Sequence, residues 1–196
     1  MTRQIIVGGV PIGGGAPVAI QSMLNTRTTD VAASLEQIRK LHTAGCQIVR
    51  LAVQNMEAAR GFAEIAKESP LPLVADIHFD YKLAIAAAEG GASKIRINPG
   101  NIGGEENVQA VVAACKERNI PIRIGVNGGS LDKKLLEKYG HPTAEALVES
   151  AFSHIALLEK YGFTDICVSM KSSTVPLMMA AYSLFSQKSD YPLHLG

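Results

Sequence analysis

Polar and charged side chains interrupt several short β-branched segments that otherwise have the composition of buried strands. Strands of a parallel sheet covered on both faces are expected to be continuously apolar, so the interruptions indicate positions that could do chemistry. The interrupting residues are Arg50 in IVRL, Asp76 and His78 in ADIHF, Arg96 and Asn98 in IRIN, Arg123 and Asn127 in IRIGVN, and Ser169 and Lys171 in VSMK.

The spacing of these residues places them on shared faces, because residues two or four apart on a strand point to the same side. Four such pairs occur: Asp76 with His78, Arg96 with Asn98, Arg123 with Asn127, and Ser169 with Lys171. If those faces point inward, four cations converge on one cavity: Arg50, Arg96, Arg123 and Lys171. Burying that much positive charge without partners costs several kcal/mol per ion, so an anionic ligand is the expected counterpart. Arginine binds phosphate oxygens in a bidentate manner and lysine supplies a compact charge, which favours a phosphorylated metabolite.

Each of these residues also has a purely structural interpretation. Asp76 could pair with Arg50 or Arg96, and His78 could be a core histidine with satisfied hydrogen bonds. The two asparagines could form turns before the proline or glycine that follows each of them. All of the residues nevertheless recur at the same end of successive strands, where the active sites of barrels lie, and this coincidence favours one shared site.

The elements that must position these residues alternate along the chain. A short apolar run, a polar or Gly-rich loop and an amphipathic stretch recur about every 25 to 30 residues, the size of a βα unit. The predicted strands are Val18–Met23, Ile48–Val53, Leu71–His78, Lys94–Asn98, Ile120–Asn127, Asp165–Met170 and Tyr191–Leu195. The predicted helices are Val31–Ala44, Met56–Glu68, Lys82–Gly90, Glu105–Asn119, Thr143–Gly162 and Thr174–Lys188. This alternation predicts a parallel sheet, and periodicity alone leaves a barrel and an open doubly wound sheet both possible.

The two ends of the chain depart from the repeat. Gln4–Val7 and Val10–Ile12 flank Gly8-Gly9, which predicts a β-hairpin that could plug the bottom of a barrel. Gly13–Gly15 is interpreted as a flexible turn, because a phosphate loop needs a preceding parallel strand and a following helix start. The chain stops as the seventh predicted strand finishes. We therefore expect residues 1–196 to be an incomplete barrel domain and a fragment of a longer protein.

The overall composition excludes several classes of partner. Lys plus Arg number 19 and Asp plus Glu number 18, so the net charge of +1 gives no global field to attract nucleic acid or a membrane surface. The apolar runs are short and the first residues lack an export signal, which predicts a soluble cytoplasmic protein. The cysteines, Cys46, Cys115 and Cys167, are widely spaced and flanked by aliphatic residues. This pattern predicts buried thiols and argues against a disulfide framework or a metal-binding knuckle.

Six motifs, in order along the whole chain, carry a family resemblance. They are Val18–Met23 (VAIQSM), Thr26–Asp30 (TRTTD), Val74–Tyr81 (VADIHFDY), Arg96–Gly103 (RINPGNIG), Pro121–Asn127 (PIRIGVN) and Pro192–Gly196 (PLHLG). Together they resemble the 4-hydroxy-3-methylbut-2-en-1-yl diphosphate synthase family of the methylerythritol phosphate pathway, which makes isoprenoid precursors. The resemblance implies a parallel (β/α)8 TIM-type barrel, here truncated after the seventh strand and preceded by the hairpin. It also implies reductive ring opening and dehydroxylation of 2-C-methyl-D-erythritol 2,4-cyclodiphosphate.

The resemblance assigns roles to the candidate site residues. Arg50, His78, Arg96, Arg123 and Lys171 would contact the diphosphate. Asp76 and Asn127 would orient the hydroxyl side of the substrate or the neighbouring basic groups, and Asn98 and Ser169 complete the predicted set.

The resemblance also implies parts that these residues do not supply. In the family a C-terminal domain carries a four-iron four-sulfur (4Fe-4S) cluster on three Cys and one Glu, electrons come from ferredoxin or flavodoxin, and the cluster domain of one subunit caps the barrel of its partner in a homodimer. The cysteines of this chain fall in a helix end, a helix interior and a strand, so we predict no cluster ligand among them. We expect the fragment alone to bind its ligand weakly at most and to reduce nothing.

Two other functions fit parts of the same pattern. Lys171 at the end of a strand could form a Schiff base with a carbonyl substrate in a lyase, provided that its amine is neutral; nearby arginines favour that form and a bound phosphate opposes it. A non-catalytic or pterin-binding barrel, similar to dihydropteroate synthase, is the third possibility. A pterin site would need more stacking and carboxylate partners than this sequence offers.

Overall fold

The computed structural model describes all residues from 1 to 196 and contains two sheets. An antiparallel hairpin is formed by β1 (Gln4–Val7) and β2 (Val10–Gly13). Six parallel strands form the second sheet: β3 (Gln21–Met23), β4 (Ile48–Ala52), β5 (Leu73–Asp76), β6 (Lys94–Ile97), β7 (Ile122–Asn127) and β8 (Ile166–Lys171). The helices are α1 (Val31–Thr43), α2 (Met56–Glu68), α3 (Tyr81–Glu89), α4 (Glu105–Arg118), the 3-10 turn η1 (Gly128–Ser130), α5 (Lys133–Tyr139), α6 (Ala144–Lys160) and α7 (Val175–Lys188).

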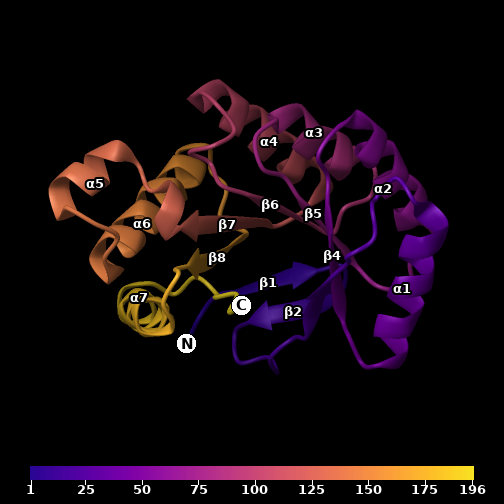
Figure 1. Cartoon of the computed structure of the whole chain (residues 1–196), viewed down its shortest axis with the longest axis horizontal. Helices are drawn as coiled ribbons and strands as arrows, with labels where there is room; N and C mark the ends of the chain where they lie inside the picture. Colours follow the sequence, from indigo (N-terminus) through magenta and orange to yellow (C-terminus); the bar gives the residue numbers. More distant parts are fainter.

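The spatial order of the six parallel strands is the same as their order in the sequence. A doubly wound sheet reverses its strand order at a switch point, whereas a barrel adds each strand beside the last. The sheet is therefore a curled half barrel, with α1 to α4 along its outer side and the hairpin at its base (Figure 1). This result confirms the barrel interpretation over the open doubly wound sheet.

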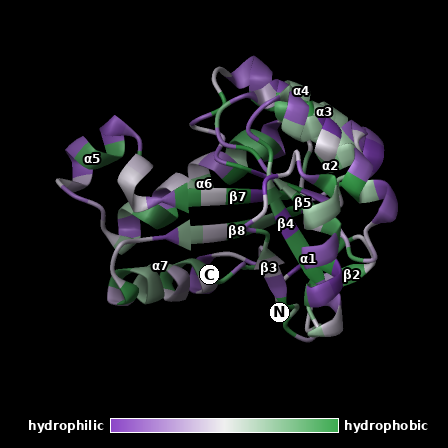
Figure 2. Cartoon of the chain, turned by 45° about the vertical axis from the view of Figure 1, so that its right-hand side comes forward, coloured by the Kyte–Doolittle hydropathy of each residue, from purple (hydrophilic) through white to green (hydrophobic).

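Alternation along the strands explains why the sheet curls around charge. The outward side chains are aliphatic, including Val49, Leu51, Ile95, Ile97 and Ile124, and they pack with the helices into a core of 48 buried residues. Figure 2 shows green, hydrophobic stretches mixed with white and purple ones along the strands. The inward positions carry the polar residues of the predicted site. Apolar and charged faces are thus separated by the two-residue period of the strand.

Side-chain caps fix where several helices begin, and so where the preceding loops must turn. The side chains of Asp30, Asn55, Asp80 and Thr143 each accept a hydrogen bond from a backbone N–H in the first turn of α1, α2, α3 and α6, respectively. These caps satisfy N–H groups that have no partner inside the helix. None of the seven α-helices combines the length and apolar character needed to cross a membrane.

Some predicted boundaries differ from the structure. The predicted strand Val18–Met23 shortens to β3, because the Val18 side chain is 94% exposed and lies outside the sheet. The predicted seventh strand, Tyr191–Leu195, is reduced to one parallel bridge between Leu193 and Val168. Pro192 has no N–H, so its carbonyl alone joins the ladder, accepting from the N–H of Val168. Helix α5 is an additional element, and its lysines, Lys133, Lys134 and Lys138, are exposed.

The hairpin closes the amino-terminal end of the half barrel. Ile5 and Val7 are buried against Ile48, Val74 and Cys167, which come from the first residues of three parallel strands. This contact confirms that the hairpin plugs the bottom. All three cysteines are buried and unpaired, as predicted.

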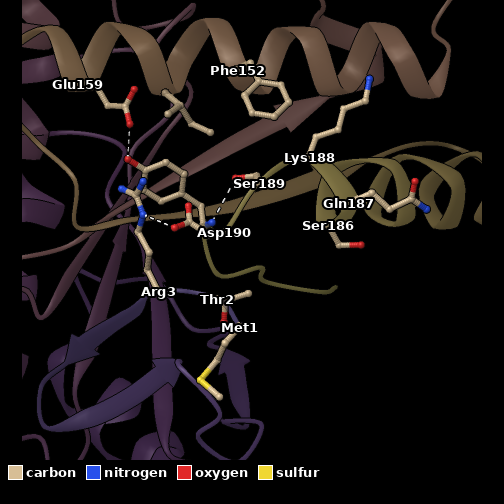
Figure 3. A pocket seen from close by; sticks show the side chains of 12 residues that line it. Met1, Thr2, Arg3, Phe152, Glu159, Ser186, Gln187, Lys188, Ser189 and Asp190 are labelled. Atoms are coloured by element: carbon tan, nitrogen blue, oxygen red, sulfur yellow. Dashed lines mark hydrogen bonds and ion pairs between the residues drawn. The ribbon is translucent and has the colours of Figure 1, made fainter.

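The start of the chain is tied to its last segment on the same side of the molecule (Figure 3). The Arg3 backbone N–H donates to the Asp190 carbonyl at 2.7 Å, and the Arg3 Nε donates to the Asp190 carboxylate at 2.9 Å. The guanidinium of Arg3 lies 4.2 Å from the centre of the Tyr191 ring, whose hydroxyl donates to Glu159 at 2.6 Å. These groups line a cavity of about 640 Å³, in which Arg3, Asp190 and Glu159 all have side-chain partners.

Candidate anion-binding site

A cavity of about 910 Å³ opens at the carboxyl ends of the parallel strands. Seven of the nine predicted site residues line it: Arg50, His78, Arg96, Arg123, Asn127, Ser169 and Lys171. No Asp or Glu is part of its lining. The structure thus brings the four predicted cations together around one space.

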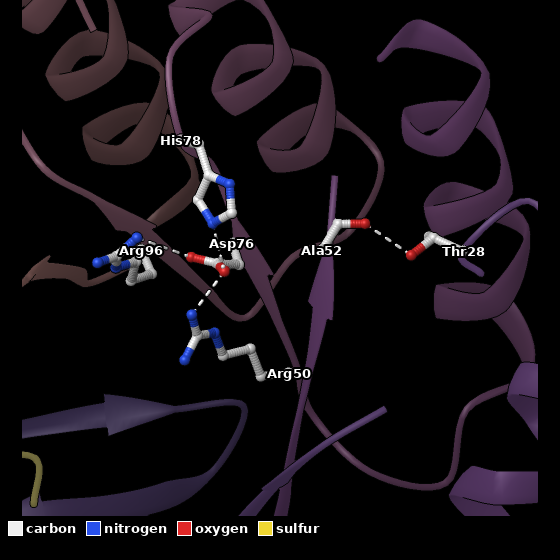
Figure 4. Close-up of polar contacts among 6 residues, drawn as sticks. All are labelled: Thr28, Arg50, Ala52, Asp76, His78 and Arg96. Carbon is white, nitrogen blue, oxygen red and sulfur yellow. Dashed lines mark hydrogen bonds and ion pairs between the residues drawn. The ribbon is translucent and has the colours of Figure 1, made fainter. Parts of the chain in front are cut away.

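Asp76 lies beneath the cavity and holds three of the basic residues (Figure 4). Its carboxylate accepts from Arg50 Nη2 at 2.5 Å and from Arg96 Nη1 at 3.1 Å, and it lies 3.0 Å from His78 Nε2. Only 1% of the Asp76 side chain is exposed. Burial alone would raise the pKa of this carboxyl, but Arg50, Arg96 and His78 together outweigh burial and hold the pKa below its ordinary value. Asp76 is therefore an ionised counter-ion that orders the basic groups.

The positive charge exceeds what this one carboxylate can balance. Arg123 is 2% exposed and makes no ion pair or hydrogen bond with any side chain. Burial, with a smaller effect of the neighbouring Arg50, lowers the pKa of Arg123 to about 10, so it is still charged at neutral pH. The Nε atoms of Arg50, Arg96 and Arg123 are all buried without a hydrogen-bond partner. Orphaned donors of this kind are costly, and an anion with several oxygens would satisfy them.

The absence of a side chain at Gly125 makes room for one of these guanidinium groups. A Cβ at this position would lie 2.5 to 2.9 Å from the Nη2, Nε and Cζ atoms of Arg96. The Arg96 guanidinium therefore lies directly against the backbone of β7, where it reaches Asp76 on one side and the cavity on the other. The glycine in the motif IRIGVN is explained by this close approach.

The remaining predicted residues differ in how they contact the site. Asn98 does not line the cavity; its side chain accepts from the N–H of Gly100 at 3.1 Å, which is the turn-forming interpretation. Ser169 lines the cavity while its hydroxyl donates to the Ile124 carbonyl at 3.3 Å. Asn127 and Lys171 stand opposite each other in the register of β7 and β8, at the mouth of the cavity.

Two residues near the charged centre, Lys94 and His194, were not among the site residues predicted from the sequence. Lys94 is fully buried, and the only hydrogen bond of its side chain runs from Nζ to Gln21 Oε1 at 3.3 Å. Burial lowers its pKa. His194 lines the cavity from the last segment of the chain. Lys94 lies two residues before Arg96 and therefore shares its face, and His194 interrupts an apolar strand as the other site residues do, so both signals were present.

This arrangement can bind and orient a polyanion. The cavity is surrounded or underlain by five basic side chains: Arg50, Lys94, Arg96, Arg123 and Lys171. Asp76 is the acidic partner of Arg50 and Arg96. No group of three or more His, Cys, Asp or Glu side chains is placed to hold a metal ion. The cavity floor is sealed by the hairpin, so a ligand must approach from the carboxyl ends of the strands.

Residues 2–196 match the family model of the GcpE TIM-barrel domain. The chain is 58% identical over 195 residues to a protein of Geobacter sulfurreducens named 4-hydroxy-3-methylbut-2-en-1-yl diphosphate synthase (flavodoxin), covering all of this chain and 55% of that protein. A protein of the same name from Idiomarina loihiensis is 60% identical over 195 residues, covering all of this chain and 52% of the relative. The chain thus spans about half the length of the curated relatives it matches.

Solved structures share the fold at low identity. The structure of 7,8-dihydropteroate synthase from Vibrio fischeri superposes with a TM-score of 0.68 at 16% identity, covering 98% of this chain and 77% of that one. A truncated 3-deoxy-D-arabino-heptulosonate 7-phosphate synthase from Thermotoga maritima gives 0.68 at 17% identity, covering 99% and 68%, respectively. These likenesses are evidence of fold alone.

Proposed function

The chain belongs to the GcpE TIM-barrel domain family, and from this premise we propose that it is the substrate-binding barrel of a 4-hydroxy-3-methylbut-2-en-1-yl diphosphate synthase. The proposed substrate is 2-C-methyl-D-erythritol 2,4-cyclodiphosphate, and the proposed reaction of the whole protein is its reductive ring opening and dehydroxylation. Residues 1–196 would form the barrel portion, and further barrel units and a redox domain would belong to the rest of the full-length protein.

The observation that carries this proposal is the set of three buried guanidinium Nε atoms without partners, around a cavity that contains no carboxylate. A cyclic diphosphate presents several anionic oxygens within a few ångströms of one another. Such a ligand can satisfy all three donors at once and neutralise Arg123, which has no counter-ion in the protein. A singly charged or neutral metabolite would leave some of the buried positive charge without a counter-charge, and the free-energy cost of burying that charge would remain.

The residues of this chain would act by binding and by electrostatic stabilisation. Opening the ring breaks a carbon–oxygen bond, and the departing diphosphate oxygen gains negative charge. Arg96 and Arg123, fixed before the ligand arrives, would stabilise that charge where it develops. Lys171 would bind the outer phosphate oxygens from the mouth of the cavity, and Asp76 would keep Arg50, Arg96 and His78 in their positions.

The redox chemistry would come from elsewhere in the full-length protein. The resemblance to the family implies a four-iron four-sulfur cluster, but the cysteines of this chain do not fit that role, because all three are separately buried in or beside different elements. The names of the relatives specify flavodoxin, and we propose flavodoxin as the electron donor here. A homodimer that brings the cluster to the barrel of the partner subunit is part of the same proposal.

Calorimetric titration with the cyclodiphosphate tests the binding role. The expected result is binding to the natural full-length protein and its loss in an Arg96→Ala and Arg123→Ala double variant. Arg39→Ala with Arg60→Ala is the matched control, because it removes the same charge from exposed positions on the outer helices. Circular dichroism establishes that each variant is folded.

The outcome also separates the competing functions. Selective binding of a pterin over the cyclodiphosphate would favour the pterin-type barrel, and borohydride trapping of a carbonyl substrate on Lys171 would favour the Schiff-base lyase. Undiminished turnover by the double variant would refute the roles assigned to the two arginines.

A further inference from the structure

His194 is held in the cavity by its backbone while its ring has no partner. Its N–H donates to the Val168 carbonyl at 2.8 Å, and its carbonyl accepts from the Tyr182 hydroxyl at 2.6 Å. The same hydroxyl accepts from the Met170 N–H at 3.0 Å, so the segment is fixed to both β8 and α7. Neither ring nitrogen of His194 makes a hydrogen bond, although the residue lines the cavity. The imidazole is thus anchored beside the space where an anion would lie.

The charged groups around this ring are all basic. Arg123 comes from β7, Lys94 from β6 and Arg50 from β4, and each disfavours a second positive charge. The neighbouring groups from α7 and β8, the Tyr182 hydroxyl and the Cys167 thiol, both have pKa values raised by burial and stay neutral. His78 lines the same cavity from the loop after β5, where it contacts Asp76. Burial, followed by these three cations, lowers the pKa of His194 to about 3, so the ring is neutral in the empty cavity.

We propose that His194 is an anion-binding residue of this cavity that takes up a proton when a phosphorylated ligand enters. The inference rests on the anion-binding role proposed for the same site. Arg123, Lys94 and Arg50 repel a protonated His194 and so contribute to its lowered pKa. The negative charge of an entering polyanion cancels this repulsion. A protonated His194 then becomes a further charged donor to the ligand.

The sign of the linkage follows from the direction of the change. A group whose pKa is higher in the complex than in the free protein favours binding at low pH, and this gain disappears as the pH rises through the pKa of the complex. Cancelling the field of the basic residues leaves the burial penalty, which is the larger effect. If the negative charge of the ligand offsets that penalty too and brings the pKa in the complex to the ordinary histidine value of about 6.5, affinity increases about 30-fold between about pH 8 and about pH 5.

Nuclear magnetic resonance of the histidine rings in the full-length protein tests the proposal directly. The His194 resonances are expected not to titrate above about pH 5 in the free protein and to titrate near neutral pH with saturating inorganic pyrophosphate. Unchanged titration in the complex would overturn the inference while leaving anion binding intact.

Affinity measurements supply the second test. Sulfate is the probe, because it stays a dianion throughout this pH range. Sulfate affinity is expected to rise as pH falls for the wild type and for His42→Gln, an exposed histidine on α1, and to rise much less for His194→Gln. An equal pH dependence in His194→Gln would overturn the inference. Failure of the folded wild type to bind either anion would overturn the proposed function along with it.

Discussion

Replacing Asp76 with asparagine removes the one negative charge of the site while keeping its shape. The carboxylate is 1% exposed and contacts Arg50 at 2.5 Å, Arg96 at 3.1 Å and His78 at 3.0 Å. The asparagine amide would direct an N–H₂ group at guanidinium donors and leave the arginines without a counter-ion. Removing one partner of a buried ion pair costs about 3–5 kcal/mol. The side chains of Arg50 and His78 are 23% and 45% exposed, so water relieves part of this cost, and we expect about 3 kcal/mol.

That loss is large for a domain of this size. It corresponds to a decrease in the midpoint of thermal unfolding of roughly 6–12 °C. Urea unfolding followed by circular dichroism measures the free energy directly. Asp190→Asn is the matched control, because Asp190 pairs with Arg3 at the surface, where the two side chains are 53% and 41% exposed. Water screens such an exposed pair, so the expected loss of stability is much smaller than for Asp76→Asn. Equal losses in the two variants would refute the view that Asp76 is the counter-ion of the site.

Three further perturbations follow from the same geometry. Gly125→Ala places a Cβ within 2.5–2.9 Å of the Arg96 guanidinium and should weaken pyrophosphate binding about tenfold in calorimetry, whereas Gly129→Ala, which meets no atom within 4 Å, should leave it unchanged. Lys94→Met removes a buried amine that has no carboxylate partner, and it should raise the free energy of unfolding by about 1–3 kcal/mol. It should also lower pyrophosphate affinity, and a destabilised variant would contradict this reasoning. Because the pKa of Asp76 is lowered in the folded protein, its contribution to stability is complete above about pH 4 and is lost as the pH falls further. The Asp76→Asn variant should therefore lose stability less steeply than the wild type on acidification. Identical acid-unfolding curves for the two proteins would refute the assignment.

The alternation of strands and helices was predictable because it depends on local periodicity. The same two-residue spacing predicted that Arg50, Arg96 and Arg123 would share the inner face, and the cavity contains all three. Periodicity carries no information on strand order, so by itself it could not distinguish the barrel from a doubly wound sheet. The family resemblance implied the barrel, and the strand order in the structure confirms it.

Contacts between distant residues limited the rest of the prediction. The side chains of Asn98 and Asp76 have equivalent positions in the sequence pattern. In the structure, the Asn98 side chain accepts from the N–H of Gly100, whereas the Asp76 carboxylate accepts from two arginines on neighbouring strands. Lys94 was missed because a lysine at the start of a strand resembles a solvated boundary residue. Its burial depends on Gln21, which lies more than 70 positions earlier in the chain.

The hairpin that seals the floor has a consequence for the order of folding. It is the first element to be synthesised, yet its apolar residues Ile5 and Val7 pack against Cys167, about 160 residues later. At a ribosomal rate of roughly 5–20 residues per second, its binding surface is incomplete for about 8–30 s. The ion pair between Arg3 and Asp190 can form only later, because Asp190 is synthesised after Cys167. Docking of the hairpin should therefore be a late event of high contact order, and the half barrel must assemble its basic interior before its own base is closed.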